Sequence, residues 1–326
     1  MVSRVYPVLR NNQILAFCLP FPSNEDGPVE PTATFPNIAR DKTSLYAVST
    51  NLTSATYTTR NNLVCIDRNG KDLWTVDLNV PEKTYFNGNS GSEFSRDGRV
   101  VWLYKPDQAY HGRAYDTVVA LDAKSGEVLA SSRLSSAGHG AEFHAPSDTN
   151  EMFLAVYEGQ DGCCFYKLRL ESGSIETVVF NLEGGSTYVL DVSLESNRFL
   201  TVCNGITLSI CSLADGEVLK RVKLDRFGSK EAYEIESWVG GYLDDNIAVV
   251  SIRGETEDEE VDGKENEISE WNQYHLVNVH TGEVLGPPGP RTLDVTDILL
   301  LHDGSWLDET DGKFYRRVYR VAHTRE

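Results

Sequence analysis

The sequence predicts an all-β fold, a six-bladed β-propeller that its N-terminal hairpin closes by completing the C-terminal blade. Three observations lead to this prediction: a repeated hairpin phrase, a second repeated phrase ahead of it, and incomplete copies of the repeat at both ends of the chain. Self-similarity at a period of roughly 40–60 residues, built from strands alone, is typical of propellers.

The hairpin phrase occurs five times. Its copies read LVCIDRNGKDLWTVDL (63–78), VVALDAKSGEVLASSRL (118–134), FYKLRLESGSIETVVF (165–180), LSICSLADGEVLKRVKL (208–224) and YHLVNVHTGEVLGPP (274–288). Each copy predicts a short apolar strand, a tight turn with glycine at its tip, and a second strand. Glycine suits the tip because the turn needs a positive φ, which a Cβ atom would oppose.

The second phrase predicts the inner half of each blade. It reads GSEFSRDGRVVWLY (91–104), GAEFHAPSDTNEMFLAVY (140–157), YVLDVSLESNRFLTVC (188–203) and EIESWVGGYLDDNIAVVSI (234–252). In each copy an inner strand carries an acidic residue, and a polar turn and a nearly all-apolar strand follow. The apolar strand suits a position that is buried on both faces between neighbouring blades. The segment TFPNIARDKTSLYAVST (34–50) fits the same frame.

The incomplete copies at the ends predict how the ring closes. The segment VYPVLRNNQILAFCLP (5–20) is a hairpin without inner strands, with Asn12 at the turn, whereas 294–304 and 313–322 are two strands without a hairpin. We therefore expect the N-terminal hairpin to complete the last blade, which would remove open sheet edges. Seven blades are the alternative, but no unassigned stretch is long enough to supply four more strands.

The chain is expected to form a single propeller domain, 1–326, with two inserted surface loops, 21–36 and 254–270. The first is rich in proline, and we expect an ordered coil that crosses one face, as a lid or as a connector. The second is rich in acids and predicts either a solvated loop or a docking loop for a basic partner.

The two phrases also resemble known repeats. FSRDGRVVWL (94–103) is similar to the WD40 phrase, and LDAKSGEVL (121–129) is similar to the repeat of quinoprotein dehydrogenases. The resemblance to WD40-like and quinoprotein-dehydrogenase-like propellers implies the fold over nearly the whole chain. It leaves function open, because such propellers include enzymes, receptors and scaffolds.

Composition narrows the classes of partner. The formal net charge of −19 disfavours nucleic acid and anionic membranes as partners. No apolar run approaches the ~20 residues of a membrane span, and the N-terminal sequence does not match a signal peptide. The six cysteines lie mostly in apolar strands without metal-ligand spacing, which favours a cytoplasmic location.

One polar residue per blade is expected near the axis, where the inner strands converge. These candidate metal ligands are Asn37, Glu93, Glu142, Asp191, Glu236 and Asp297. Because converging carboxylates repel one another, something must compensate their charge. Three interpretations remain open: local hydrogen bonds satisfy the acids, a divalent cation such as Ca²⁺ binds, or a cationic ligand binds.

A more distant resemblance concerns the divalent cation. Six-bladed lactonases and phosphotriesterases hold Ca²⁺ at the axis with Glu, Asn and Asp from different blades, which implies a metal-dependent hydrolase for a similar ring. In this chain Glu142 and His144 are the candidate catalytic residues, with His139 on the other side of Glu142. A Gly-His pair at this point of a WD40-like repeat is alternatively structural and braces the turn.

The predicted function is a non-enzymatic interaction or ligand-binding module that uses one face and the axial mouth. Its partner would be a basic protein or a cationic small molecule. The polar loop KPDQAYHGRAYD (105–116) is expected to present Tyr110, His111 and Tyr115 on an outer face. The alternative is the divalent-metal-dependent hydrolase, lactonase- or esterase-like, or another small-molecule enzyme at the axial acids.

Overall fold

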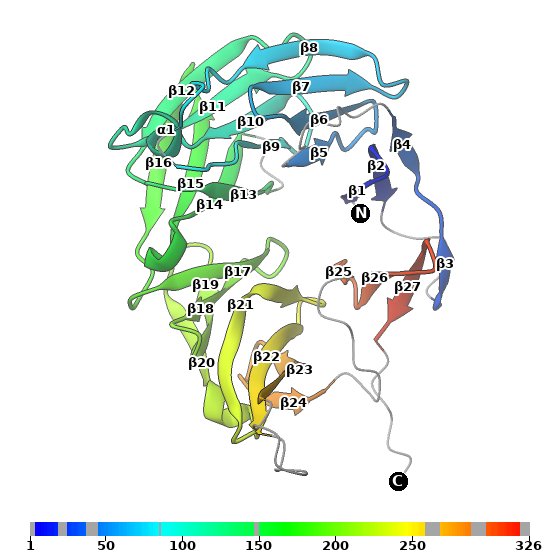
Figure 1. Cartoon of the computed structure of the whole chain (residues 1–326), viewed down its shortest axis with the longest axis vertical. Helices are drawn as coiled ribbons and strands as arrows, with labels where there is room; N and C mark the ends of the chain where they lie inside the picture. The colour runs from blue at the N-terminus through cyan, green and yellow to red at the C-terminus, as the bar shows by residue number, and fades with distance from the viewer. Residues whose placement is uncertain are drawn as a thin grey trace. The chain divides into compact units, whose positions relative to one another are not determined.

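The computed structural model describes residues 4–18, 25–36, 45–84, 86–146, 150–257, 268–287 and 298–319. Within these ranges the regular structure is almost entirely β-strand (Figure 1). The chain divides into two compact units, which are described separately: unit 1 is 1–22 with 30–182, and unit 2 is 23–29 with 183–326. No helix among the described residues is long and apolar enough to span a membrane.

The described residues of unit 1 form four antiparallel sheets. The first sheet has the order β1-β2-β4, and the other three follow the chain from β5 to β8, from β9 to β12 and from β13 to β16. The strands are β1 (Val5–Arg10), β2 (Gln13–Cys18), β4 (Ala33–Phe35), β5 (Tyr46–Val48), β6 (Ser54–Thr58), β7 (Asn62–Asp67), β8 (Asp72–Asp77), β9 (Gly91–Phe94), β10 (Val100–Lys105), β11 (Asp116–Asp122), β12 (Val128–Leu134), β13 (Gly140–His144), β14 (Glu151–Tyr157), β15 (Cys163–Glu171) and β16 (Ser174–Phe180). Two short helices lie in connections, α1 (Asp107–His111) and η1 (Gly159–Asp161).

In the described part of unit 2 there are three antiparallel sheets. Two follow the chain from β17 to β20 and from β21 to β24, and the third has the order β25-β26-β27-β3. The strands are β3 (Gly27–Val29), β17 (Thr187–Ser193), β18 (Arg198–Cys203), β19 (Thr207–Ser212), β20 (Val218–Lys223), β21 (Ala232–Tyr242), β22 (Ile247–Glu257), β23 (Ile268–Asn278), β24 (Val284–Gly286), β25 (Leu299–Leu300), β26 (Ser305–Thr310) and β27 (Lys313–Val318). One 3-10 helix, η2 (Leu224–Phe227), follows β20.

The predicted β-propeller is confirmed, but it has seven blades, the stated alternative, and the count of six is wrong. The N-terminal hairpin does not complete the C-terminal blade as predicted, because β1 and β2 form a sheet with β4. The last sheet instead takes β3 as its fourth strand, with Val29 opposite Phe314, and Asp26 Oδ1 accepts a hydrogen bond from the Val318 amide at 2.8 Å.

The predicted number of blades was wrong because the segment 21–36, which was predicted to be a loop, contains two strands. Its residues 27–29 and 33–35 are the strands β3 and β4, and each is too short to show the alternation by which a strand is recognised in sequence. The next inner strand is β5, so the frame proposed for 34–50 was shifted toward the N-terminus.

The second predicted loop also carries strands at both ends. The strands β22 and β23 pair from Ile247 opposite Asn278 as far as Glu257 opposite Ile268. The rest of that prediction, 258–267, lies outside the described residues.

The core lies between successive sheets, as the apolar strands predict. In unit 1, Trp102 and Val118 pack with Leu154 and Tyr166 of the next sheet. In unit 2, residues of β18 and β19 pack with residues of β21, β22 and β23. These rigid sheets hold the connecting loops from which a binding site would be built.

Candidate functional site

The pairing register shows which residues occupy the position predicted for the axial acids. Glu93 lies opposite Trp102, Glu142 opposite Ala155 and Asp191 opposite Leu200. In β5, β21 and β25 the same position holds Ala47, Gly241 and Leu299. Three of the six predicted residues therefore share this register, two in unit 1 and one in unit 2.

The other three predicted residues differ. Glu236 precedes Gly241 in a bulge of β21, where its carboxylate accepts a hydrogen bond from the Ser251 hydroxyl. Asn37 and Asp297 lie outside the described residues. Within the part of the chain that the structure describes, no group of three or more His, Cys, Asp and Glu side chains forms a metal-sized cluster. The six-residue metal ring stays a prediction.

Glu93 and Glu142 form an interacting acidic pair in unit 1. Burial raises the pKa of Glu93 to about 8, the amide of Phe94 opposes this by donating to Oε1 at 2.8 Å, and the charge of Glu142 adds to the increase. Glu142 is more exposed, and its Oε2 accepts a hydrogen bond from the Tyr157 hydroxyl at 2.9 Å. Glu93 therefore holds a proton at neutral pH, and a bound cation would favour its release.

The two histidines beside Glu142 have different surroundings. His144 is half-buried at the end of β13, and its Nε2 atom is buried without a hydrogen-bond partner among the described residues. His139 lies before β13, where its amide donates to the Tyr157 carbonyl at 2.9 Å and its Nδ1 lies 3.2 Å from the Asn87 carbonyl. The contacts of His139 are those of a residue that braces a loop.

Asp191 lies at the centre of a hydrogen-bonded cluster in unit 2. Its Oδ1 accepts from the Val192 amide at 2.7 Å, and its Oδ2 accepts from the Tyr242 amide at 2.6 Å. Nε2 of His302 lies 3.0 Å from the same Oδ2. His302 was missed from the sequence, because nothing in the phrase LLLHDG distinguishes a partner of Asp191 from a residue at a polar turn.

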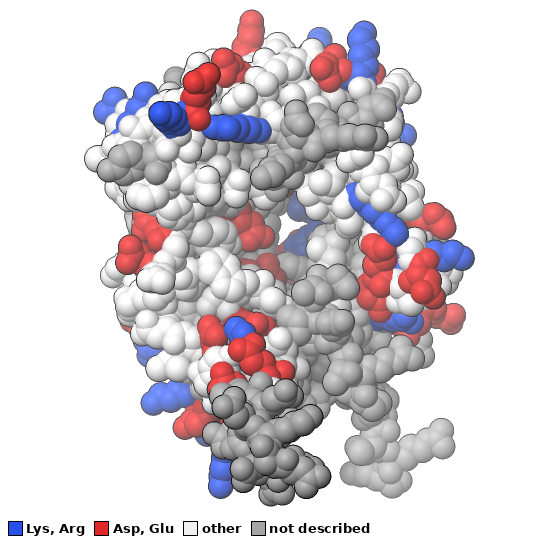
Figure 2. Space-filling model, viewed as in Figure 1, with Lys and Arg blue, Asp and Glu red and all other residues white. Residues whose placement is uncertain are grey.

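The two units differ strongly in charge. Unit 2 contains 30 of the 49 acidic residues and 14 of the 30 basic residues of the chain, whereas unit 1 contains 19 and 16. Figure 2 shows acidic side chains gathered over β21 and β22 of unit 2. The attraction for a cationic partner that the net charge predicts therefore originates mainly in unit 2.

The connections at one edge of the unit 1 sheets surround three open depressions. These connections are β6–β7, β8–β9, β10–β11, β12–β13 and β14–β15. Antiparallel order along the chain brings them to the same edge, because each strand reverses the direction of the one before it. Loops held by a rigid scaffold are common binding elements.

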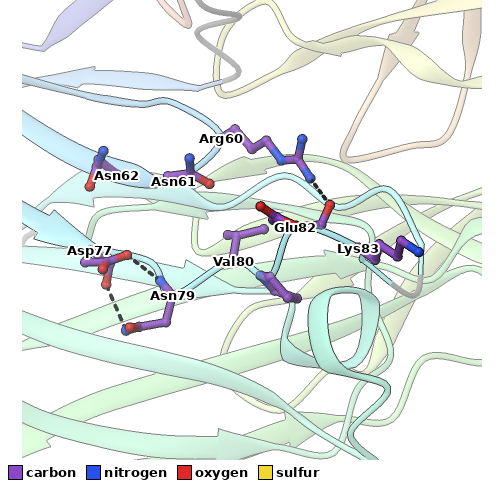
Figure 3. A pocket seen from close by; sticks show the side chains of 9 residues that line it. Arg60, Asn61, Asn62, Asp77, Asn79, Val80, Glu82 and Lys83 are labelled. Atoms are coloured by element: carbon purple, nitrogen blue, oxygen red, sulfur yellow. Dashed lines mark hydrogen bonds between the residues drawn. The ribbon is translucent and has the colours of Figure 1, made fainter.

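The largest depression, about 940 Å³, lies between the β6–β7 turn and the segment after β8 (Figure 3). The guanidinium of Arg60 donates to the Glu82 carbonyl at 2.8 Å and so joins its two sides. Asn79 donates from its amide to Asp77 Oδ1 at 2.7 Å and from Nδ2 to the Asp77 carbonyl at 3.2 Å. Its left-handed backbone, with φ of 56°, turns the chain along the edge of the depression.

A second depression of about 410 Å³ shares Arg60 and Val80 with the first. We call the two together the Arg60 groove. Its further lining residues are Thr59, Asn61, Asn62, Asp77, Asn79, Pro81, Glu82, Lys83, Thr84, Asn87, Gly88, Asn89, Ser90 and Tyr110.

The predicted outer face of 105–116 is only partly observed. Tyr110 is 5% exposed, because α1 turns it inward, where its hydroxyl lies 3.2 Å from both the Gly88 carbonyl and Ser90 Oγ. The prediction that Tyr110 lies on an outer face is therefore wrong. His111 is exposed. Tyr115 is in contact with the guanidinium of Arg133, which lies 4.4 Å from the centre of its ring.

The third depression, about 520 Å³, lies above a buried carboxylate. Asp116 accepts hydrogen bonds from the Tyr104 hydroxyl at 2.9 Å, the Ser136 hydroxyl at 2.8 Å, the Gly138 amide at 2.8 Å and the Gln108 amide at 3.1 Å. Burial raises the pKa of Asp116, and these hydrogen bonds oppose the increase. Because three of its four partners come from the surrounding connections and the fourth, Tyr104, lies near the end of β10, Asp116 stabilises this edge of the unit.

No protein-family model matches the chain, and no curated protein matches it. Solved structures resemble it in fold. A crystal structure of BamB from Moraxella catarrhalis aligns with a TM-score of 0.51 and 13% identity, over 96% of this chain and 81% of that chain. The β-propeller domain of Cps50 (Swd1) from Myceliophteria thermophila aligns with a TM-score of 0.45 and 9% identity, over 86% of this chain and 97% of that chain. At such identities the resemblance concerns the propeller fold alone.

Proposed function

We propose that the protein is a non-enzymatic interaction module in which the Arg60 groove of unit 1 binds an extended segment of a partner protein. The observation that carries the proposal is the chemistry of the lining. Five carboxamides and four hydroxyls line the groove: Asn61, Asn62, Asn79, Asn87, Asn89, Thr59, Thr84, Ser90 and Tyr110. A carboxamide both donates and accepts hydrogen bonds, so such a lining matches the alternating N–H and C=O groups of a peptide backbone.

The same lining favours binding over catalysis. Among its described residues the groove has no histidine or cysteine, and its two carboxylates, Asp77 and Glu82, are exposed. A solvated carboxylate lacks the buried environment that is typical of catalytic acids and bases. Arg60 and Lys83 balance these two carboxylates in the lining, so the basic character of the partner is inferred from the charge of the whole chain.

The acid excess of the chain supports a basic partner protein. Long-range attraction raises the rate of association with a positively charged partner and repels nucleic acid. A cytoplasmic location, without a nucleic-acid or membrane partner, belongs to the same proposal, and the absence of a disulfide among the six cysteines supports it.

A library of random twelve-residue peptides displayed on phage, panned against the purified full chain, tests the groove. We expect enriched peptides whose affinity falls at least about tenfold in the double variant Asn61→Ala/Asn87→Ala, since several hydrogen bonds are lost together. Asn69→Ala is the matched control, because Asn69 is an exposed asparagine in the β7–β8 turn. Failure to enrich peptides, or equal binding by all three proteins, would overturn the proposal.

A second candidate function, the metal-dependent hydrolase, keeps one specific observation in its favour. A bound cation would offset the repulsion between the carboxylates of Glu93 and Glu142. His144, whose Nε2 atom is buried, follows Glu142 by two residues in β13. In this proposal Ca²⁺ or another divalent ion would bind Glu93 and Glu142, and His144 would serve as the base. Stabilisation by metal ions decides between the two functions, as set out in the Discussion.

A further inference from the structure

The inner strand β21 carries a large bulge in unit 2. Its pairing with β22 jumps from Ile235 opposite Ile252 to Gly240 opposite Val250, so four residues of β21 face a single residue of β22. Gly240 and Gly241 end the bulge with φ of 131° and 149°. A Cβ atom on Gly240 would lie 2.5 Å from the Val249 carbonyl oxygen, so the bulge depends on glycine there.

The base of the bulge is held from a neighbouring strand. The carboxylate of Asp191 lies so close to Gly241 that a Cβ atom there would clash with it, and it accepts the hydrogen bond from the Tyr242 amide. His302 pairs with the same carboxylate. Backbone distortions that neighbouring residues hold in place are common at binding sites.

The bulge exposes an aromatic residue. Trp238, one of the four bulged residues, is 64% exposed, whereas Trp102 is fully buried and Trp74 is 9% exposed. The ring of Tyr188 on β17 lies 4.7 Å from the indole, centre to centre, at 58°. We call this pair the Trp238 platform. Its large exposed aromatic surface is typical of a binding residue, because tryptophan is otherwise among the most buried side chains.

The sheet that carries the Trp238 platform is rich in acidic residues. Glu236 lies in the bulge itself, and the charges of Glu234, Glu255 and Glu270 act on the Tyr233 side chain of the same sheet. Figure 2 shows acidic side chains, with basic ones among them, over β21 and β22. A negative field around an exposed indole favours a cation that can lie on the ring face.

We propose that the Trp238 platform binds an arginine side chain of a basic peptide segment, with the guanidinium plane over the indole. Arginine is favoured over lysine because its planar, weakly hydrated guanidinium stacks on aromatic rings while its N–H groups still reach carboxylates. The inference concerns unit 2 and does not depend on the Arg60 groove of unit 1.

A hexa-arginine peptide is the probe, and acrylamide quenching of tryptophan fluorescence is the readout on the full chain. Quenching reports chiefly on Trp238, because it is the most exposed tryptophan among those described. We expect hexa-arginine to protect this fluorescence from acrylamide, hexa-lysine to protect it less, and hexa-glutamate and maltohexaose not to protect it. Protection should weaken as the salt concentration rises, because salt screens the acidic field.

Calorimetric titration of variants with the same peptide completes the test. Trp238→Ala is expected to weaken binding about two- to fivefold, the range of an exposed cation–π contact. The matched control is Val178→Ala, which shortens a side chain that is 60% exposed in unit 1. It should bind as the wild type does.

Three results would overturn the proposal. Binding of hexa-arginine that Trp238→Ala leaves unchanged would show general attraction by the acidic surface. Equal protection by maltohexaose would assign the platform to sugars. Absence of protection in wild-type protein would remove the cation site altogether. The wild-type quenching result needs no variant, so it holds even if Trp238→Ala were to alter the fold.

Discussion

The Asp191 carboxylate packs against Gly241 and leaves no room for a side chain at that position. A Cβ atom on Gly241 would lie 2.4 Å from Asp191 Oδ2, which instead accepts the Tyr242 amide at 2.6 Å. Gly241 occupies the register position at which Glu93 and Glu142 carry their side chains, so glycine at this position admits the acid of the neighbouring strand.

Replacement of Gly241 by alanine should therefore destabilise the protein. We expect a loss of about 3 kcal/mol in the free energy of unfolding, from backbone strain at positive φ and from displacement of Asp191. The control is Gly228→Ala, since Gly228 has φ of 84° and open space around it, and its loss should be about 1 kcal/mol. Urea unfolding of both variants measures the difference, and equal losses would contradict the role of Asp191.

Stability should depend on pH through Glu93. The pKa of Glu93 is about 8 in the folded protein, whereas its ordinary value, which applies to the unfolded chain, is 4.5. The stability that this proton contributes is complete below pH 4.5 and is lost as pH rises through about 8. In the variant Glu93→Gln this dependence of stability on pH is expected to be absent.

Urea unfolding at pH 6 and at pH 9 measures this effect. The wild type should lose about 2–3 kcal/mol more than Glu93→Gln between these values. Glu142→Gln is the control for the neighbouring charge and should reduce the loss, because it lowers the pKa of Glu93. Parallel pH profiles for wild type and Glu93→Gln would show that Glu93 titrates normally.

The buried carboxylate of Asp116 should be important for the stability of unit 1. Asp116→Ala leaves two amides and two hydroxyls without their shared acceptor, and we expect a loss of about 2–4 kcal/mol. Asp122→Ala is the matched control, because Asp122 accepts hydrogen bonds from the Lys124 and Ser125 amides in an exposed turn, and its loss should be below about 1 kcal/mol. Thermal melts that rank the two variants the other way would contradict this assignment.

Divalent metal ions should leave the melting curve unchanged if the protein is an interaction module. Millimolar Ca²⁺, Mg²⁺ and Mn²⁺ are added to chelator-treated protein, and the melting temperature is recorded for wild type, Glu93→Gln and Glu142→Gln. An ion that binds the folded state raises the melting temperature by mass action. A rise in the wild type that both variants lose would instead support the hydrolase at Glu93 and Glu142.

Local features of the fold were predictable because short-range chemistry determines them. The hairpin phrase around Gly70 is the β7–β8 pair, and the phrase around Gly126 is the β11–β12 pair. The apolar strand after Glu93 is the buried strand β10, with Trp102 fully buried. Glu93, Glu142 and Asp191 were found because each lies two or three residues before a polar turn, in a phrase that repeats.

The candidate site was less predictable. The bulge of β21 moved Glu236 away from the shared register, and no pattern in the sequence reveals three extra residues in one strand. Trp238 went unnoticed because exposure of a tryptophan depends on the backbone that presents it. Tyr110 lies in a polar loop, yet α1 buries it against Gly88, a contact between separate connections.

The sequence by itself determined that this chain is a β-propeller, since strands, turns and apolar faces follow from neighbouring residues and repeat along it. Only the tertiary structure decided that there are seven blades, that β3 rather than the N-terminal hairpin pairs with β27, and that Asp191 contacts Gly241 and His302. The physical reason is that these relationships join segments far apart in the chain. Three-residue strands and single polar contacts of this kind form only when the surrounding sheets have already brought their partners together.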